Sequence, residues 1–202
     1  MAIGLGVAAA PVGNTESAAH NGNLIPREVA LPDGTLATVN ENKGLMFTAR
    51  QDQPHRAARS SSLDKRMTYT KGGRDDYCGE TTPQETFGPA TPLASDCLSI
   101  AYAYAYPTDG FWTITPSDFN STVDGLDGEW ATIATSGTCA FKVKFQEPPA
   151  QTLYFGTNDL RFYIQTYVGD AQDGHIQVWG NIACNNNQPT VLFLNSWVMT
   201  HS

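Results

Sequence analysis

Four cysteines place the strongest covalent constraint on the fold of this chain of 202 residues. They are Cys78, Cys97, Cys139 and Cys184, separated by 19, 42 and 45 positions. Zinc sites usually bring two ligands within a few residues of each other, and these spacings do not. An even number of widely spaced cysteines favours two disulfides formed in an oxidising compartment, with buried free thiols as the alternative. Four cysteines allow three pairings, and their spacing does not choose among them.

The composition of the chain changes at residue 66. All four tryptophans and 20 of the 21 aromatic residues follow Arg66. Residues 1–66 are rich in Ala, Asn, Ser, Arg and Pro, so they offer little apolar surface to offset the roughly 1–2 kcal/mol that ordering each backbone residue costs. We therefore predict a signal remnant and mostly disordered leader over 1–66 and a single disulfide-bonded domain over 67–202.

Several short features are typical of a secreted precursor. The chain begins with an apolar stretch, MAIGLGVAAA, that resembles the end of a secretory signal and is too short to span a bilayer. Two adjacent basic residues, Lys65 and Arg66, lie at the change in composition, and we predict a cut after Arg66 by a secretory-pathway protease. A solvated loop that stays intact is the alternative. Asn120 begins the only N-glycosylation triplet in the sequence, and we predict it as an acceptor.

Charge narrows the classes of partner. The segment 67–202 contains 5 Lys and Arg residues against 14 Asp and Glu residues, a net charge of −9. Nucleic acids and anionic membranes are bound through clustered basic residues. We therefore expect no nucleic-acid partner and do not predict membrane contact.

Hydrophobic periodicity predicts two helices. Apolar residues over 91–104 recur with the spacing of one helix face, and this face carries Cys97 inward. The second helix is expected over 157–168, with Thr157 or Asn158 as its N-cap and Gly169 ending it.

Alternation and β-branched or aromatic content predict the strands. They are expected at 110–116, 130–146, 152–155, 173–185 and 190–200, the last of them central or covered. From Cys139 to Phe145 one face is apolar and the other carries Lys142 and Lys144, which we interpret as a solvated face balancing nearby acids. Residues 75–90 are predicted to be loop with at most a short strand, and Gly180 is expected to mark a bulge.

Together these elements predict an α+β fold, with two helices packed on one mostly antiparallel sheet of about four to six strands, an α/β sandwich. In such a fold, a bond between Cys97 and Cys139 would attach the first helix to the longest strand region. Cys78 would then pair with Cys184.

Five segments, in this order, resemble the fungal necrosis-inducing effector domain, the homologues of an extracellular protein two effector first described from a leaf-mould fungus. They are DYCGE at 76–80, ASDCLSIA at 94–101, GTCAFKV at 137–143, FGTNDLRFYI at 155–164 and DGHIQVWGNIAC at 173–184. The resemblance covers about Asp76 to Asn185 and implies a small secreted effector of a plant-associated fungus that induces host cell death. It also implies a fold like that of the fungal killer toxins.

Residues suited to catalysis are few. The segment 67–202 holds only His175 and His201 as histidines, and no G-x-S-x-G sequence occurs. A carboxylate pair of the glycosidase type could come from the acidic run Asp124, Asp127 and Glu129, but such runs are usually solvated loops. We therefore predict no catalytic residues, no metal ligands and no cofactor.

The favoured hypothesis is a secreted, monomeric, non-enzymatic virulence protein that binds a host plant protein or cell-surface component in the host apoplast. The main alternative is a killer-toxin-like protein that perturbs the membranes or channels of competitors. A small secreted hydrolase is the less favoured alternative.

Overall fold

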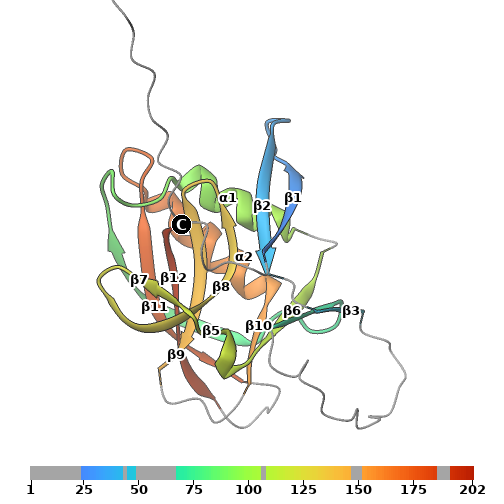
Figure 1. Ribbon diagram of the computed structural model, residues 1–202. Coiled ribbons are helices and arrows are strands. Elements are labelled where there is room, and N and C mark those ends of the chain that lie inside the picture. Colours follow the sequence, from blue (N-terminus) through green and yellow to red (C-terminus); the bar gives the residue numbers. More distant parts are fainter. Residues whose placement is uncertain (1–23, 43–44, 49–66, 106–107, 147–151, 186–191) are drawn as a thin grey trace, which may run out of the picture.

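The computed structural model describes residues 24–42, 45–48, 67–105, 108–146, 152–185 and 192–202 (Figure 1). The larger of its two sheets is an eight-stranded antiparallel sheet with the order β1-β2-β8-β9-β12-β11-β5, and β7 pairs with β8 beside this path. The strands of this main sheet are β1 (Leu24–Ala30), β2 (Leu36–Asn42), β5 (Cys78–Thr86), β7 (Ser121–Val123), β8 (Leu126–Ser136), β9 (Cys139–Phe145), β11 (Gln177–Cys184) and β12 (Phe193–His201).

A smaller, four-stranded sheet has the order β10-β6-β4-β3. Its strands are β3 (Leu45–Thr48), β4 (Thr68–Lys71), β6 (Gly110–Ile114) and β10 (Leu153–Gly156), and only β3 and β4 run parallel to each other. Two helices, α1 (Ala94–Ala103) and α2 (Thr157–Tyr167), pack against these strands, and short 3-10 turns form η1 (Pro116–Asp118) and η2 (Val168–Asp170). The prediction of two helices on antiparallel sheet is confirmed, but the strands form two sheets instead of one and are more numerous than expected.

The helices bury the faces that their periodicity predicted. In α1, Cys97 and Ile100 are fully buried, and in α2, Leu160 and Ile164 are fully buried. The helix starts differ slightly from the prediction, because Leu93 and Gly156 occupy the N-cap positions. None of the described helices is both long and apolar enough to cross a membrane.

Aromatic side chains fill the space between the main sheet and α2. The indole of Trp197 on β12 stacks on the ring of Tyr163 from α2, with ring centroids 4.9 Å apart, and on Phe141 of β9 at 5.9 Å. β12 pairs with β9 on one side and β11 on the other, so the last strand is central, as expected. Because neighbouring residues of a strand point to opposite faces, Ser196 lies on the face away from the helices.

The segment around Pro83 corrects one prediction. Residues 78–86, expected to be mostly loop, form the nine-residue strand β5. A proline cannot donate a ladder hydrogen bond, but among the described strands β5 is the last of the main sheet and pairs only with β11. An edge position therefore tolerates the proline that made the sequence resemble a loop.

The position of Gly180 corrects a second prediction, which was that this residue marks a bulge. It is regularly paired with Trp197 on β12 and with Pro83 on β5, and the register shift in β11 falls between Ile182 and Cys184 instead. The Trp197 indole N–H crosses Gly180 to donate to Thr81 Oγ1 at 3.0 Å. A Cβ at position 180 would lie 3.1 Å from Trp197 Nε1, so glycine is needed for this close approach and not for a bulge.

The described part of the leader differs from the sequence-based prediction. Residues 1–66 were expected to be mostly disordered, but β1 and β2 form a hairpin whose second strand pairs with β8 from Val39↔Ser136 to Glu41↔Ala134. Val39 is fully buried and Val29 is 6% exposed. The hairpin is therefore part of the core of the domain.

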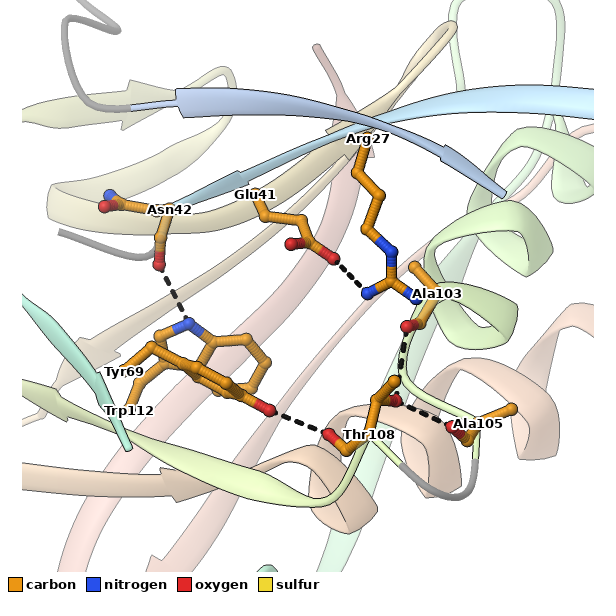
Figure 2. A network of polar contacts seen from close by, with 8 residues as sticks. All are labelled: Arg27, Glu41, Asn42, Tyr69, Ala103, Ala105, Thr108 and Trp112. Atoms are coloured by element: carbon orange, nitrogen blue, oxygen red, sulfur yellow. Dashed lines mark hydrogen bonds and ion pairs between the residues drawn. The ribbon is translucent and has the colours of Figure 1, made fainter. Parts of the chain in front are cut away.

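A network of polar contacts lies where this hairpin meets the smaller sheet (Figure 2). Arg27 on β1 donates to the buried carboxylate of Glu41 on β2 at 2.9 Å, and the Trp112 indole N–H on β6 donates to the Asn42 carbonyl at 2.9 Å. Below them, the Tyr69 hydroxyl donates to the Thr108 carbonyl at 2.7 Å. Burial is the largest cause that raises the pKa of both Tyr69 and Tyr104, and the Glu41 carboxylate adds to it. The hairpin thus adds a charged pair to an otherwise aromatic part of the core.

Candidate functional site

Two of the five segments that carry the family resemblance meet at the disulfide between Cys97 and Cys139, whose Cα atoms are 5.2 Å apart. Beside it, the backbone N–H and the hydroxyl of Thr138 each donate to Asp96 Oδ2 at 2.7 Å. Gly137 has a φ of +50°, and a Cβ there would collide with the Asp96 carboxylate. The Asp-Cys and Gly-Thr-Cys sequences therefore form one clamp that fixes α1 to β9.

The other three segments meet at the disulfide between Cys78 and Cys184, whose Cα atoms are 4.0 Å apart. The buried carboxylate of Asp159 on α2 accepts backbone N–H bonds from Gly156 at 2.9 Å, Tyr77 at 2.9 Å and Cys78 at 3.1 Å. Burial raises the pKa of Asp159 to about 7, against the opposite effect of these N–H donors. The second clamp therefore fixes the start of α2 to β5 and β11.

In both clamps a carboxylate binds backbone N–H groups next to a disulfide, so the segments of the family resemblance hold the fold together. The two bonds join the same pairs that the sequence analysis put forward. Among the remaining predicted residues, Asn120 is exposed just before β7, where it could accept a glycan, and its glycosylation stays a prediction. Lys65 and Arg66 lie outside the described residues, so their cleavage also stays a prediction.

The side chains considered for catalysis do not assemble into a site. His175 is bonded through Nδ1 to the Thr91 carbonyl at 2.8 Å, and His201 is exposed at the end of β12. The acidic run is exposed on β8 and the turn before it, at Asp124, Asp127 and Glu129. Within the described parts of the chain, no group of three or more His, Cys, Asp and Glu side chains is placed to hold a metal ion.

The outer face of the main sheet, opposite the helices, carries a groove of about 430 Å³. We call it the outer groove; it is lined by Gly125, Leu126, Asp127, Trp130, Lys144, Gln146, Trp179, Asn181 and Ser196. These residues come from four strands that are neighbours in the sheet, β8, β9, β12 and β11, from the position just after β9 and from the turn between β7 and β8. The groove is a candidate binding site because it combines aromatic surface with several hydrogen-bonding side chains.

A row of paired residues forms the floor of the outer groove. Lys144 lies opposite Ser196, and Ser196 lies opposite Asn181. The Ser196 hydroxyl donates to Asn181 Oδ1 at 3.0 Å and accepts from Gln146 Nε2 at 3.3 Å. The floor is therefore mostly neutral and polar, with its side chains held in place by one another.

Trp130 and Trp179 provide the apolar part of the outer groove. Trp130 is fully buried in a small second cluster with Val123 and Val198, and Trp179 packs partly buried against this cluster. The short β7–β8 hairpin covers the cluster. The exposed part of Trp179 is thus the aromatic surface that a ligand would meet first.

Two lysines fasten the β7–β8 hairpin over the sheet. Lys142 Nζ donates to the Thr122 carbonyl at 2.9 Å, and Lys144 Nζ donates to the Asp127 carbonyl at 2.5 Å. Lys144 Nζ also lies 4.7 Å from the centroid of the Trp130 ring, within range of a cation–π contact. Burial lowers the pKa of Lys142. Both side chains were predicted on the outer face; they donate hydrogen bonds to backbone carbonyls, and the charge of Asp124 also acts on Lys142.

The sequence contained no local signal for the outer groove. Its members extend from residue 125 to residue 196, and only the order of the strands brings them together. The alternation in β9 placed Lys144 on the outer face, but it did not indicate which strands would lie beside it.

The clamps and the β-rich core define a small domain held by two disulfides. A family whose description reads "pathogen effector; putative necrosis-inducing factor" (Hce2) matches residues 77–184, which is more than half of the chain. The chain therefore belongs to this family, as the resemblance of its five segments implied. No match was found among curated proteins.

Proposed function

We propose that this protein is a secreted, non-enzymatic effector that acts in the host apoplast by binding a host plant component through the outer groove. Membership of a pathogen effector family supports the role. The groove supports the mode of action, because it presents Trp179 beside the neutral side chains of Ser196, Asn181 and Gln146. Such a surface suits a ligand with an apolar face and hydroxyl or amide groups, on a host protein or on the cell surface.

Other features of the molecule are consistent with this proposal. Two disulfides are typical of proteins that function in an oxidising extracellular compartment. The acidic net charge of the chain, −8, favours solubility and suits neither nucleic acid nor anionic lipid. We propose a monomer with the α/β-sandwich arrangement of the killer toxins, supported by the packing of both helices against the sheets.

The test is infiltration of leaves from a panel of plant genotypes with purified protein, comparing the native chain with the variant Trp179→Ala. We expect cell death in responsive genotypes with the native chain and a strongly reduced response with the variant. Phe162→Ala is the matched control, because Phe162 is 50% exposed on α2 and lies outside the groove. The absence of a response in every genotype contradicts the effector role, and an equal loss in both variants contradicts the assignment of the groove.

Two further assays separate the alternatives. Leakage of dye from lipid vesicles would support the killer-toxin-like hypothesis over ligand binding. Hydrolysis of RNA or of cell-wall glycan by the purified protein would support the hydrolase hypothesis. We expect neither activity.

A further inference from the structure

Met67 is the residue after the predicted cut, and its backbone nitrogen is hydrogen-bonded to a carboxylate. Its N–H donates to Asp118 Oδ1 at 2.7 Å, and the Met67 side chain is 1% exposed. The other carboxylate oxygen, Asp118 Oδ2, accepts from the backbone N–H and from the hydroxyl of Thr115, both at 2.8 Å. Asp118 is thereby fixed in orientation at the η1 turn, with one oxygen directed at the start of β4.

We propose that cleavage after Arg66 produces a two-chain protein in which the new N-terminus of Met67 forms an ion pair with Asp118 and the β1–β2 hairpin stays bound without a covalent link. This inference rests on the predicted cut and is independent of the outer groove. It assigns Asp118 a role that neither its sequence context nor the family resemblance indicated.

The chemistry of the cut creates the ion pair. An endoprotease specific for dibasic sites hydrolyses the peptide bond: the bond from the Arg66 carbonyl carbon to the Met67 nitrogen breaks, and one water is added across it. Arg66 gains a carboxylate, and Met67 gains an α-amine that takes up a proton near neutral pH. A neutral amide donor to the Asp118 carboxylate thus becomes an ammonium donor, so the existing hydrogen bond gains the attraction between two opposite charges.

The contacts of the β1–β2 hairpin explain why it should stay bound after the cut. It shares backbone pairing with β8 and buries Val39, and its Asn42 carbonyl accepts the Trp112 indole N–H. Asn42 Nδ2 also donates to the Thr132 carbonyl at 3.0 Å. Downstream of the hairpin, β3 pairs with β4. All these contacts join residues before the cut to residues after it, and none requires the intervening peptide bond.

Burial of Met67 also has a consequence for the order of events. A protease needs an extended substrate on both sides of the bond that it cuts. Because Met67 is buried and its N–H is bonded, cutting is expected before β4 joins the sheet, or only when β4 opens.

The test starts from the full chain with both disulfides formed. It is digested with a dibasic-specific endoprotease in enough urea to open β4, and the urea is then removed. Native mass spectrometry should show both chains together with the mass of one added water, and denaturing conditions should separate them. The variant Val39→Asp should lose the smaller chain under native conditions. Separation of the two native-sequence chains on removal of urea overturns the proposal.

The ion pair is tested by the rate at which an amine-reactive reagent labels Met67 in the cut protein. A neighbouring carboxylate raises the pKa of an α-amine above its ordinary value of about 8. A rise of about one unit slows labelling at pH 7 by about tenfold. Asp118→Asn should restore the ordinary rate, and Thr115→Val, which removes a bond to the other oxygen, should not. Equal rates in the native protein and Asp118→Asn overturn the assignment, as does an equal acceleration by Thr115→Val.

The outcome for the proposed function is read separately. Cut and uncut proteins are infiltrated into the same leaves, and cell death reports the effector role. Native mass spectrometry reports the two-chain state, so either proposal can fail without the other.

Discussion

Replacement of both Cys97 and Cys139 by alanine removes the bond that fixes α1 to β9. The two residues are 42 positions apart. Without the cross-link the unfolded chain regains conformational entropy, which lowers its free energy by about 4 kcal/mol. Both side chains are fully buried, and the two lost sulfur atoms add on the order of 1–2 kcal/mol, by analogy with buried methylene groups. We therefore expect the free energy of unfolding to fall by about 5–6 kcal/mol, a large part of the ~5–15 kcal/mol of a typical domain.

The second disulfide provides an internal comparison. Cys78 and Cys184 are 106 positions apart, and the same relation gives about 4.8 kcal/mol of loop entropy. Cys78 is only partly buried, so its replacement leaves less of a cavity. The two double-alanine variants should therefore differ from each other by only about 1 kcal/mol, since the two effects oppose each other.

Equilibrium unfolding in urea, followed by tryptophan fluorescence, measures these changes. Thr138→Val is the matched control, because it removes the hydroxyl's bonds to Asp96 and from the Leu93 N–H while leaving the disulfide in place. We expect that variant to lose about 1–3 kcal/mol. A loss below about 2 kcal/mol in the Cys97→Ala, Cys139→Ala variant would refute the reasoning, because it would mean that the cross-link does not restrict the unfolded chain.

Three further predictions concern the pH dependence, the hairpin and the main sheet. Because the pKa of Asp159 is raised to about 7, the folded protein keeps a proton that the unfolded chain loses above its ordinary pKa of 3.8, so stability should fall between about pH 4 and pH 7. Asp159→Asn should flatten this slope in pH-dependent urea unfolding, and a pKa below 3.8 by NMR titration would contradict it. Val39→Ala should cost about 2 kcal/mol in urea unfolding, whereas a change under about 0.5 kcal/mol would mean that the hairpin is not docked in solution. Gly180→Ala should cost about 1–3 kcal/mol by displacing the Trp197 indole from Thr81, and unchanged chemical shifts of that indole N–H would count against it.

Local patterns in the sequence were sufficient for much of the domain. The periodicity of 91–104 and 157–168 predicted both helices and their buried faces, because a helix buries residues at a fixed spacing. The alternation from Cys139 to Phe145 predicted β9 and the orientation of Lys142 and Lys144 for the same kind of reason. The order of five short segments was enough to indicate the family.

The remaining features depended on contacts between distant parts of the chain. Pro83 and the polar residues around it form a strand only because β11 pairs with one side of β5. The hairpin at 24–42 is ordered because β8 and Trp112 provide partners that no property of the leader itself indicated. The outer groove and the contact between Met67 and Asp118 likewise join residues that lie far apart in sequence. The sequence alone determined the two helices, the strand β9 and their buried faces, since those follow from local spacing. The tertiary structure decided the strand at the sheet edge, the groove and the docking of the leader, since these depend on which strands become neighbours.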